Sequence, residues 1–305
     1  VVLSRADAGG PPPNTTLTTS PLLWSPVPGE EVLVVAGRAD KHSFVLAFYR
    51  LPGDRYRIAS SLILSNTANT ITAAVLGVGV SATGSVNTLT LGAGTNVVNA
   101  NTVNIGTGAR DTGVISFGGN ATGSFVLRNA AGTGPVAFNM GTGGATTGFT
   151  AANVFDMTGH NADLLLGAVN IGTQTSRLGA MTNDFSFNQG TLVMASLNLS
   201  SRNTAGGTTS NFNIGGGTVT SGPVVMATTG AAAGVAVANL NITGGSVTMT
   251  GSITKGGGAG TDTASFTLNG ATAVLDMGGN NLGGAGADGL PIPSEFVYVN
   301  NFRDI

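Results

Sequence analysis

Short segments in which apolar and polar residues alternate return through residues 185–282 of this chain. Four of them begin 27, 28 and 26 positions apart: Phe185-Ser186-Phe187, Phe212-Asn213-Ile214, Leu240-Asn241-Ile242 and Phe266-Thr267-Leu268. Alternation of this kind places the apolar side chains of a strand on one face. A loose period of this length is typical of repeat architectures, in which one unit cannot bury its own apolar face. The pattern predicts an all-β solenoid of stacked coils.

A second short apolar strand follows each of these segments, at Leu192–Met194, Val219, Val247–Met249 and Val274–Met277. Between residues 65 and 184 the same texture continues less regularly, as strands of three to five residues separated by Gly, Asn, Thr and Ser. The nearest candidate for a helix is Ala231–Ala238, but Gly230, Gly234 and two valines favour a loop or strand there. We therefore expect a solenoid of about eight to nine coils over residues 65–290.

The two ends of the chain differ from this texture. Residues 1–28 hold six of the eleven prolines, which favour extended backbone, and are predicted to form a Pro-rich arm. Residues 29–64 carry strand-like runs joined by the turn sequence Pro52-Gly53-Asp54, and predict a small antiparallel β cap. Residues 291–305 are expected to form a C-terminal strand or tail. A cap with a polar outer face is what a solenoid needs to cover its terminal coil.

Asparagine recurs in the form apolar-Asn-Ile, at Asn104, Asn170, Asn213 and Asn241. Stacked amides of this kind can form hydrogen-bonded ladders between coils. Asparagine is also common simply because it tolerates left-handed turns. The sequence does not decide between these two interpretations.

Composition supports an ordered but unusual protein. Of the 305 residues 49 are Gly and 9% are charged, while 41% are hydrophobic, which is enough apolar material to order the chain. A net charge of −2 gives no electrostatic case for binding nucleic acid or an anionic membrane. No stretch of about 20 apolar residues predicts a transmembrane helix. The absence of cysteine, together with few charges and much Thr, Asn and Gly, is typical of an exported bacterial surface protein, so we expect an extracellular or cell-surface location.

Calcium binding is the most specific metal-site hypothesis that the sequence supports. The segment Gly283–Leu290 fits one nonapeptide of a calcium-binding β-roll, and Gly257–Asp262 repeats most of it 26 residues earlier. One coil apart, Asp262 and Asp288 could approach within about 4.8 Å. Calcium takes six to eight oxygen ligands, however, and two isolated copies supply too few. A turn-forming role for these residues is therefore favoured, and no metal or cofactor is expected.

Catalytic groups show no comparable pattern. The acids of the predicted solenoid are single residues at irregular spacing, and the densest group is Asp156, His160 and Asp163. Glycan hydrolysis would need two carboxylates converging on one face. A surface loop is the favoured interpretation of that group, and the chain is not expected to be an enzyme.

The strands Phe212–Thr220 and Leu240–Thr248 resemble autotransporter-associated β-strand repeats, which occur in passenger regions of bacterial surface proteins. The resemblance covers residues 85–285 at most and implies a right-handed parallel β-helix displayed outside the cell. It carries over no functional residue, and the charged and Pro-rich first 64 residues depart from the pattern.

We therefore expect a structural rod, whose terminal segments pair with neighbouring copies to give head-to-tail filaments. The assembly candidates are Leu22, Leu23, Trp24, Phe296, Tyr298 and Phe302. The alternative is an adhesin or glycan-binding passenger that displays loops such as Gly141–Ala152 or Gly230–Ala238. A polysaccharide-active enzyme is a lesser alternative.

Overall fold

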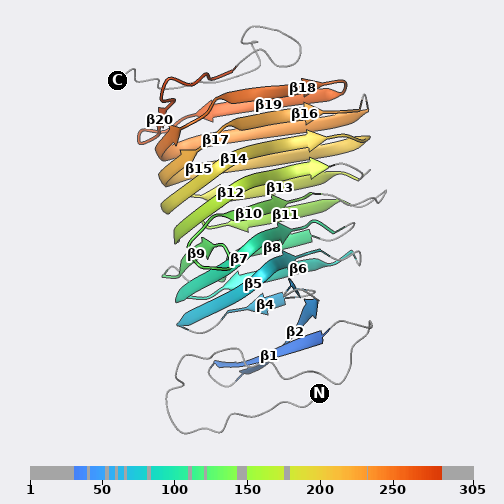
Figure 1. Cartoon of the computed structure of the whole chain (residues 1–305), viewed down its shortest axis with the longest axis vertical. Coiled ribbons are helices and arrows are strands. Elements are labelled where there is room, and N and C mark those ends of the chain that lie inside the picture. The colour runs from blue at the N-terminus through green and yellow to red at the C-terminus, as the bar shows by residue number, and fades with distance from the viewer. Residues whose placement is uncertain are drawn as a thin grey trace.

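The computed structural model describes residues 31–39, 42–51, 55–58, 61–64, 67–80, 84–108, 112–119, 122–142, 150–174, 179–231 and 233–283, with backbone alone before residue 61. The described residues form twenty strands and no helix, which confirms the all-β prediction. Among them, the strands from β4 onwards (the stack) pair in parallel and make a β-solenoid of about seven turns. Figure 1 shows these strands lying one above another along the long axis.

Each turn of the stack contributes three strand segments, which lie on three faces. On the first face are β4 (Ser61–Ile63), β6 (Val86–Leu91), β8 (Thr112–Phe117), β11 (Ala151–Asp156), β13 (Met181–Phe187), β19 (Thr261–Leu268) and the first halves of β15 (Gly206–Ser221) and β17 (Gly234–Met249). On the second are β9 (Ser124–Arg128), β20 (Val274–Asp276), the second halves of β15 and β17, and the first halves of β5 (Ala68–Val78), β7 (Thr95–Ile105), β12 (Asn161–Gln174) and β14 (Gly190–Arg202). On the third are β10 (Val136–Met140), β16 (Val224–Thr229), β18 (Ile253–Gly258) and the second halves of β5, β7, β12 and β14.

The recurring apolar residue of the sequence forms one continuous buried column. Phe185, Phe212, Leu240 and Phe266 are register partners from turn to turn. The column continues toward the N-terminus through Phe155, Ile115, Leu89 and Leu62, and all eight side chains are at most 3% exposed. The predicted repeat is therefore confirmed over residues 185–282, and the same column continues back to Leu62 through the part of the chain where the sequence showed a less regular texture.

The solenoid has about seven turns, where eight to nine were expected, and one of the turns is longer than the others. Register partners are mostly 26 to 31 residues apart, but Val114 on β8 pairs with Val154 on β11, 40 positions later. Part of the extra length is a turn in which the Asn129 side chain accepts hydrogen bonds from the backbone amides of Thr133 and Gly134. Insertions of this kind lengthen the loop between strands. Here the pairing of β10 with β12 continues after one register irregularity between Val136 and Phe138.

The first three strands precede the stack. β1 (Glu31–Ala39) pairs antiparallel with β2 (His42–Leu51), which pairs antiparallel with β3 (Arg55–Ile58). β3 in turn runs parallel to β5. The side chains of β1 to β3 lie outside the described part, so a capping role for this element stays a prediction.

Aromatic side chains stack in the centre of the core. The Phe185 ring lies between those of Phe155 and Phe212, with centroids 4.8 Å and 4.4 Å away. Phe138 on β10 meets the rings of Phe155 and Phe185 edge-on, at 5.2 Å and 5.7 Å. Aromatic pairs at these separations add to the free energy gained from burial alone. This cluster stabilises the middle turns, next to the long one.

A corner of the solenoid pairs small residues with buried polar ones. After the third face the backbone adopts positive φ at Gly106, Gly141 and Gly172. A Cβ atom at these positions would lie 1.6 Å from Asn153 Oδ1, 2.0 Å from Asn183 Oδ1 and 2.3 Å from Ser210 Oγ, respectively. One turn further the corner residue is Ser200, with a φ of 57°. In the facing column, which contains Asn153, Asn183 and Ser210, the next residue is Ala238. Larger corner residues thus coincide with smaller facing residues.

Candidate functional site

Two outward amide ladders run along the solenoid. On the third face the Nδ2 groups of Asn139, Asn170 and Asn198 each donate to the Oδ1 of the preceding turn's asparagine, beginning at Asn104, over 3.0, 3.0 and 2.9 Å. On the first face Asn241 donates to Asn213 over 2.9 Å. The ladder interpretation of the apolar-Asn-Ile segments is therefore confirmed, although the four predicted residues belong to two ladders.

A parallel row on the first face carries the same arrangement. Asn239 Nδ2 donates to Asn211 Oδ1 over 2.7 Å, and Asn211 donates to the carboxylate of Asp184. Ladder side chains are partly exposed, so each amide can also meet water. These rows join successive turns through side chains in addition to the backbone ladder.

Buried amides were not anticipated from the sequence. Asn153 Nδ2 donates to Asn183 Oδ1 over 2.9 Å, Asn183 donates to Ser210 Oγ over 3.3 Å, and the Asn residues are 0% exposed. Asn96, also 0% exposed, bonds to the backbone oxygens of Gly92, Gly94 and Ser124. Because these amides satisfy buried partners, they serve the fold and are not available to a ligand.

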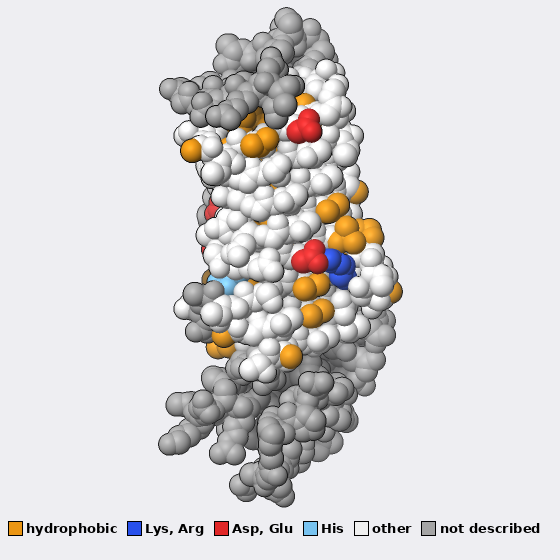
Figure 2. Space-filling model, turned by 90° about the vertical axis from the view of Figure 1, so that its left-hand side faces the viewer, with side chains coloured by type: hydrophobic (Ala, Val, Ile, Leu, Met, Phe, Trp, Pro, Cys, Tyr) orange, Lys and Arg blue, Asp and Glu red, His pale blue; other side chains and the backbone are white. Residues whose placement is uncertain are grey.

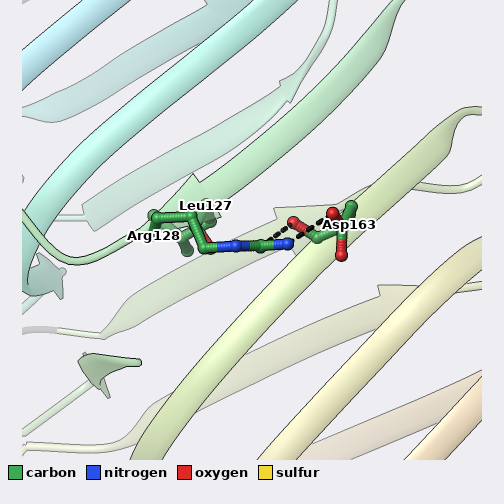
Figure 3. A network of polar contacts seen from close by, with 3 residues as sticks. All are labelled: Leu127, Arg128 and Asp163. Atoms are coloured by element: carbon green, nitrogen blue, oxygen red, sulfur yellow. Dashed lines mark hydrogen bonds and ion pairs between the residues drawn. The ribbon is translucent and has the colours of Figure 1, made fainter. Parts of the chain in front are cut away.

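The Arg128 side chain binds the following turn on the second face. Its guanidinium donates to the backbone oxygens of Leu127 and Asp163, over 2.8 and 2.9 Å, and to the Asp163 carboxylate (Figure 3). The side chains are 18% and 49% exposed. An exposed ion pair of this kind is worth about 0–1 kcal/mol. Its position fits a link between turns.

The three residues of the densest predicted acid group, Asp156, His160 and Asp163, contact different neighbours. Asp156, the last residue of β11, accepts a hydrogen bond from the Thr158 backbone amide over 2.9 Å. His160 is 9% exposed, stacks on Phe117 at 3.7 Å and places Nδ1 3.2 Å from the Gly123 oxygen. Asp163 lies in β12 and pairs with Arg128. Each of these groups is therefore engaged by a different neighbour.

Asp262, the described member of the calcium hypothesis, faces a lysine. Its Oδ1 lies 3.7 Å from Lys255 Nζ, and the side chains are 14% and 18% exposed. Asp288 lies outside the described residues. Within the described ranges no three His, Cys, Asp or Glu side chains gather as metal ligands would.

Arg202 is a fully buried cation at the end of β14. Its guanidinium donates to the backbone oxygens of Gly179, Thr204 and Ala205, over 3.3, 3.2 and 2.6 Å at the closest nitrogen of each. No sequence signal marks this position, because the residues it binds belong to two successive turns of the solenoid. Its contacts fit a structural role in shaping the corner at residues 203–205.

The interior offers little room for a ligand in the region of β14 to β18. A void of about 10 Å³, roughly the space of one water, is lined mainly by apolar side chains that include Met194, Phe212 and Ile242. Its lining belongs to the core, so it fits a packing defect.

One described face of the stack is mainly polar and uncharged. Figure 2 shows a face on which most side chains are neither apolar nor charged, with few acidic and basic groups. Exposed large hydrophobic residues in the described part are Ile63, Val86, Val235 and Val274. No helix among the described residues has the length and apolar character needed to cross a membrane.

The predicted assembly residues Leu22, Leu23, Trp24, Phe296, Tyr298 and Phe302 lie outside the described residues. Most of the loop Gly141–Ala152 does so too. A scan against protein-family models, a search of curated proteins and a search of solved structures found no match to this chain.

Proposed function

We propose that this chain is a structural β-solenoid segment of an exported surface protein, and that its action is mechanical. The observation that carries the proposal is the single core that runs from Leu62 to Leu268, in which the apolar column of Phe185 continues through all the stacked strands of the first face. The charged groups of the described stack are held in separate structural contacts. This arrangement favours a scaffold over catalysis.

Stiffness follows from the stacking. Interior strands bond to a strand on each side, and the amide ladders join the same turns again through side chains. With strands about 4.8 Å apart, seven turns extend the stack by about 34 Å. A longer rod would require further copies or further turns, since length scales with turn number.

Assembly through the terminal segments is the part of the proposal that concerns residues 1–28 and 291–305. It is motivated by the apolar residues of those segments, Trp24 and Phe296 among them. Deletion of residues 1–28 should abolish filaments seen by negative-stain electron microscopy of the full chain. Filaments of unchanged length and number would contradict head-to-tail assembly.

The surface location rests on composition and on the resemblance to autotransporter-associated repeats, which also implies right-handed winding. Antibodies against the folded stack should label intact, unpermeabilised source cells, or should detect the protein in the culture medium. Labelling that appears only after permeabilisation would refute the location. A structural role and an extracellular location are therefore tested separately.

A glycan-binding role is the second candidate. The outward positions of β13, β15 and β19 present hydroxyl and amide groups, at Thr182, Ser186, Thr209, Asn211, Asn213, Thr263, Ser265 and Thr267. Uncharged donors and acceptors of this type suit neutral saccharides. A glycan array probed with the full chain should give binding that is lost with Thr209→Val; no binding to any neutral glycan would reject this candidate.

A further inference from the structure

The turn that follows β19 contains Asn269-Gly270, the one Asn-Gly pair in the sequence. Asn269 is exposed, and its backbone amide donates to the Ile242 oxygen of the preceding turn of the solenoid over 2.9 Å. Its side-chain amide makes no hydrogen bond to any residue that the structure describes. The side chain is therefore free to turn toward the backbone of its own dipeptide.

The glycine of this pair is required by the fold. Gly270 has a φ of +148°, and a Cβ atom there would lie 2.0 Å from the Thr243 backbone oxygen. Glycine has no Cβ, so it fits this position and leaves its own backbone nitrogen unshielded. Within the described ranges the Gly270 amide donates no hydrogen bond that would hold this nitrogen in place.

An earlier turn offers a comparison at the same position of the repeat. Asn188 and Asn269 follow register-matched residues of one inward column, three turns apart. Asn188 is half-buried, and its Oδ1 accepts a hydrogen bond from the Gly159 backbone amide over 2.7 Å. The residue after Asn188 is Gln189. At Asn188, therefore, the side chain is held and the following backbone nitrogen is flanked by a Cβ.

The Asn-Gly pair can undergo one covalent reaction with water alone. The Gly270 backbone nitrogen attacks the side-chain carbonyl carbon of Asn269, the bond from that carbon to Nδ2 breaks, and ammonia leaves with the proton of the Gly270 amide. Water then opens the resulting five-membered succinimide at either carbonyl, which gives aspartate or isoaspartate. Attack within one dipeptide gains from proximity. We propose that Asn269 is a site of spontaneous deamidation in the folded protein, and that its isoaspartate product loosens β20.

The effect on β20 follows from the length of the turn. Isoaspartate carries the chain through the side-chain carbon, which adds one backbone atom between Asn269 and Gly270. β20 begins at Val274 and pairs in parallel with residues 246–248 of β17. Because β20 has only three residues, a longer turn displaces much of its pairing at once. This modification weakens the last described strand with time, and it is independent of the surface location and of filament formation.

The first test follows the folded full chain in mildly alkaline buffer, which promotes loss of the Gly270 amide proton. Peptide mapping with tandem mass spectrometry should show conversion of the Asn269 amide to a carboxylate, with both aspartate and isoaspartate among the products. The rate at Asn188 should be lower by at least about tenfold. No conversion at Asn269, an equal rate at Asn188, or aspartate as the only product would overturn the proposal.

Two variants separate the new charge from the extra backbone atom. Asn269→Asp carries the carboxylate without lengthening the chain, and Asn269→Gln keeps an amide whose ring closure would need six members. Conversion in Asn269→Gln should be slower by at least about tenfold. Hydrogen exchange of the β20 amides should be at least about tenfold faster in the isoaspartate fraction and within about twofold of the wild type in both variants. Equal acceleration in Asn269→Asp, or none in the isoaspartate fraction, would refute the effect on β20.

Discussion

The corner at Gly172 gives the sharpest test of how the turns fit together. In Gly172→Ala the alanine would have to adopt a backbone φ of +68°. Its Cβ atom would lie 2.3 Å from Ser210 Oγ and 2.6 Å from Thr208 Oγ1. A left-handed conformation costs a residue with a Cβ about 1–2 kcal/mol, and overpacking a buried site costs about 1–3 kcal/mol. We therefore expect Gly172→Ala to lower the free energy of unfolding by about 2–5 kcal/mol.

Gly167→Ala is the matched control. Gly167 lies in the same strand, β12, and a Cβ there would meet its nearest atom at an ordinary 3.6 Å. Its backbone also lacks the positive φ, so alanine should be neutral or stabilise the protein by up to about 1 kcal/mol. The assay is equilibrium unfolding in urea followed by far-UV circular dichroism, with the denaturant slope compared between variants.

Adding Ser210→Ala to Gly172→Ala should recover part of the loss. The clash with Ser210 Oγ is removed, while that with Thr208 remains and Asn183 loses an acceptor worth about 1 kcal/mol. We expect a coupling energy of about 0.5–2 kcal/mol in the double-mutant cycle. If Gly172→Ala costs no more than Gly167→Ala, or if the two substitutions are additive, the coupled-corner explanation is refuted.

Three further predictions use the same unfolding assay. Asn139→Ala, which breaks two ladder bonds, should cost about 1–2 kcal/mol, more than Asn198→Ala at the end of that ladder; equal costs would argue against a role for the ladder. Phe185→Ala should cost about 3–5 kcal/mol because it leaves a cavity between two stacked rings, and a cost under about 1 kcal/mol would contradict the aromatic core. Ala227→Gly, at a φ of 52°, should be neutral or should stabilise the protein by up to about 1 kcal/mol. Ala238→Gly, at a residue without positive φ, should destabilise it by about 0.5–1 kcal/mol. Effects of the opposite sign would exclude backbone strain at residue 227.

The repeat could be predicted because it rests on large apolar residues. Phe185, Phe212, Leu240 and Phe266 occupy one buried column, and their alternation with polar residues is visible over a few positions. The third strand segment of each turn was harder to assign to the repeat. It contains Leu197–Leu199 in one turn and Val224–Met226 in the next, and Gly222 and Pro223 separate the latter from the strand before it.

The buried polar positions could not be predicted from the sequence. Asn153 and Asn183 look like turn residues, yet they point inward and take partners from the neighbouring turn. Their environment depends on glycines more than 40 positions away, Gly106 and Gly141, which leave room for the amides. Likewise the sequence does not show that Lys255 follows the buried Met226 in the same inward column, because this depends on the register between β16 and β18. Contacts between turns, rather than local pattern, decide these sites.

In a parallel solenoid the chain advances along the long axis by one strand spacing with each turn. The exposed positions Thr70, Thr191, Thr218 and Ser246 lie in one outward row of the second face, and the chain contains no cysteine to interfere with labelling. Spin labels on cysteines placed at Thr70 and at each of the other three positions would be measured in pairs by electron paramagnetic resonance. The stack predicts distances of about 19, 24 and 29 Å, rising by about 4.8 Å per turn. Distances that fail to rise in this order, or that rise by the length of an extended chain, would contradict a parallel solenoid.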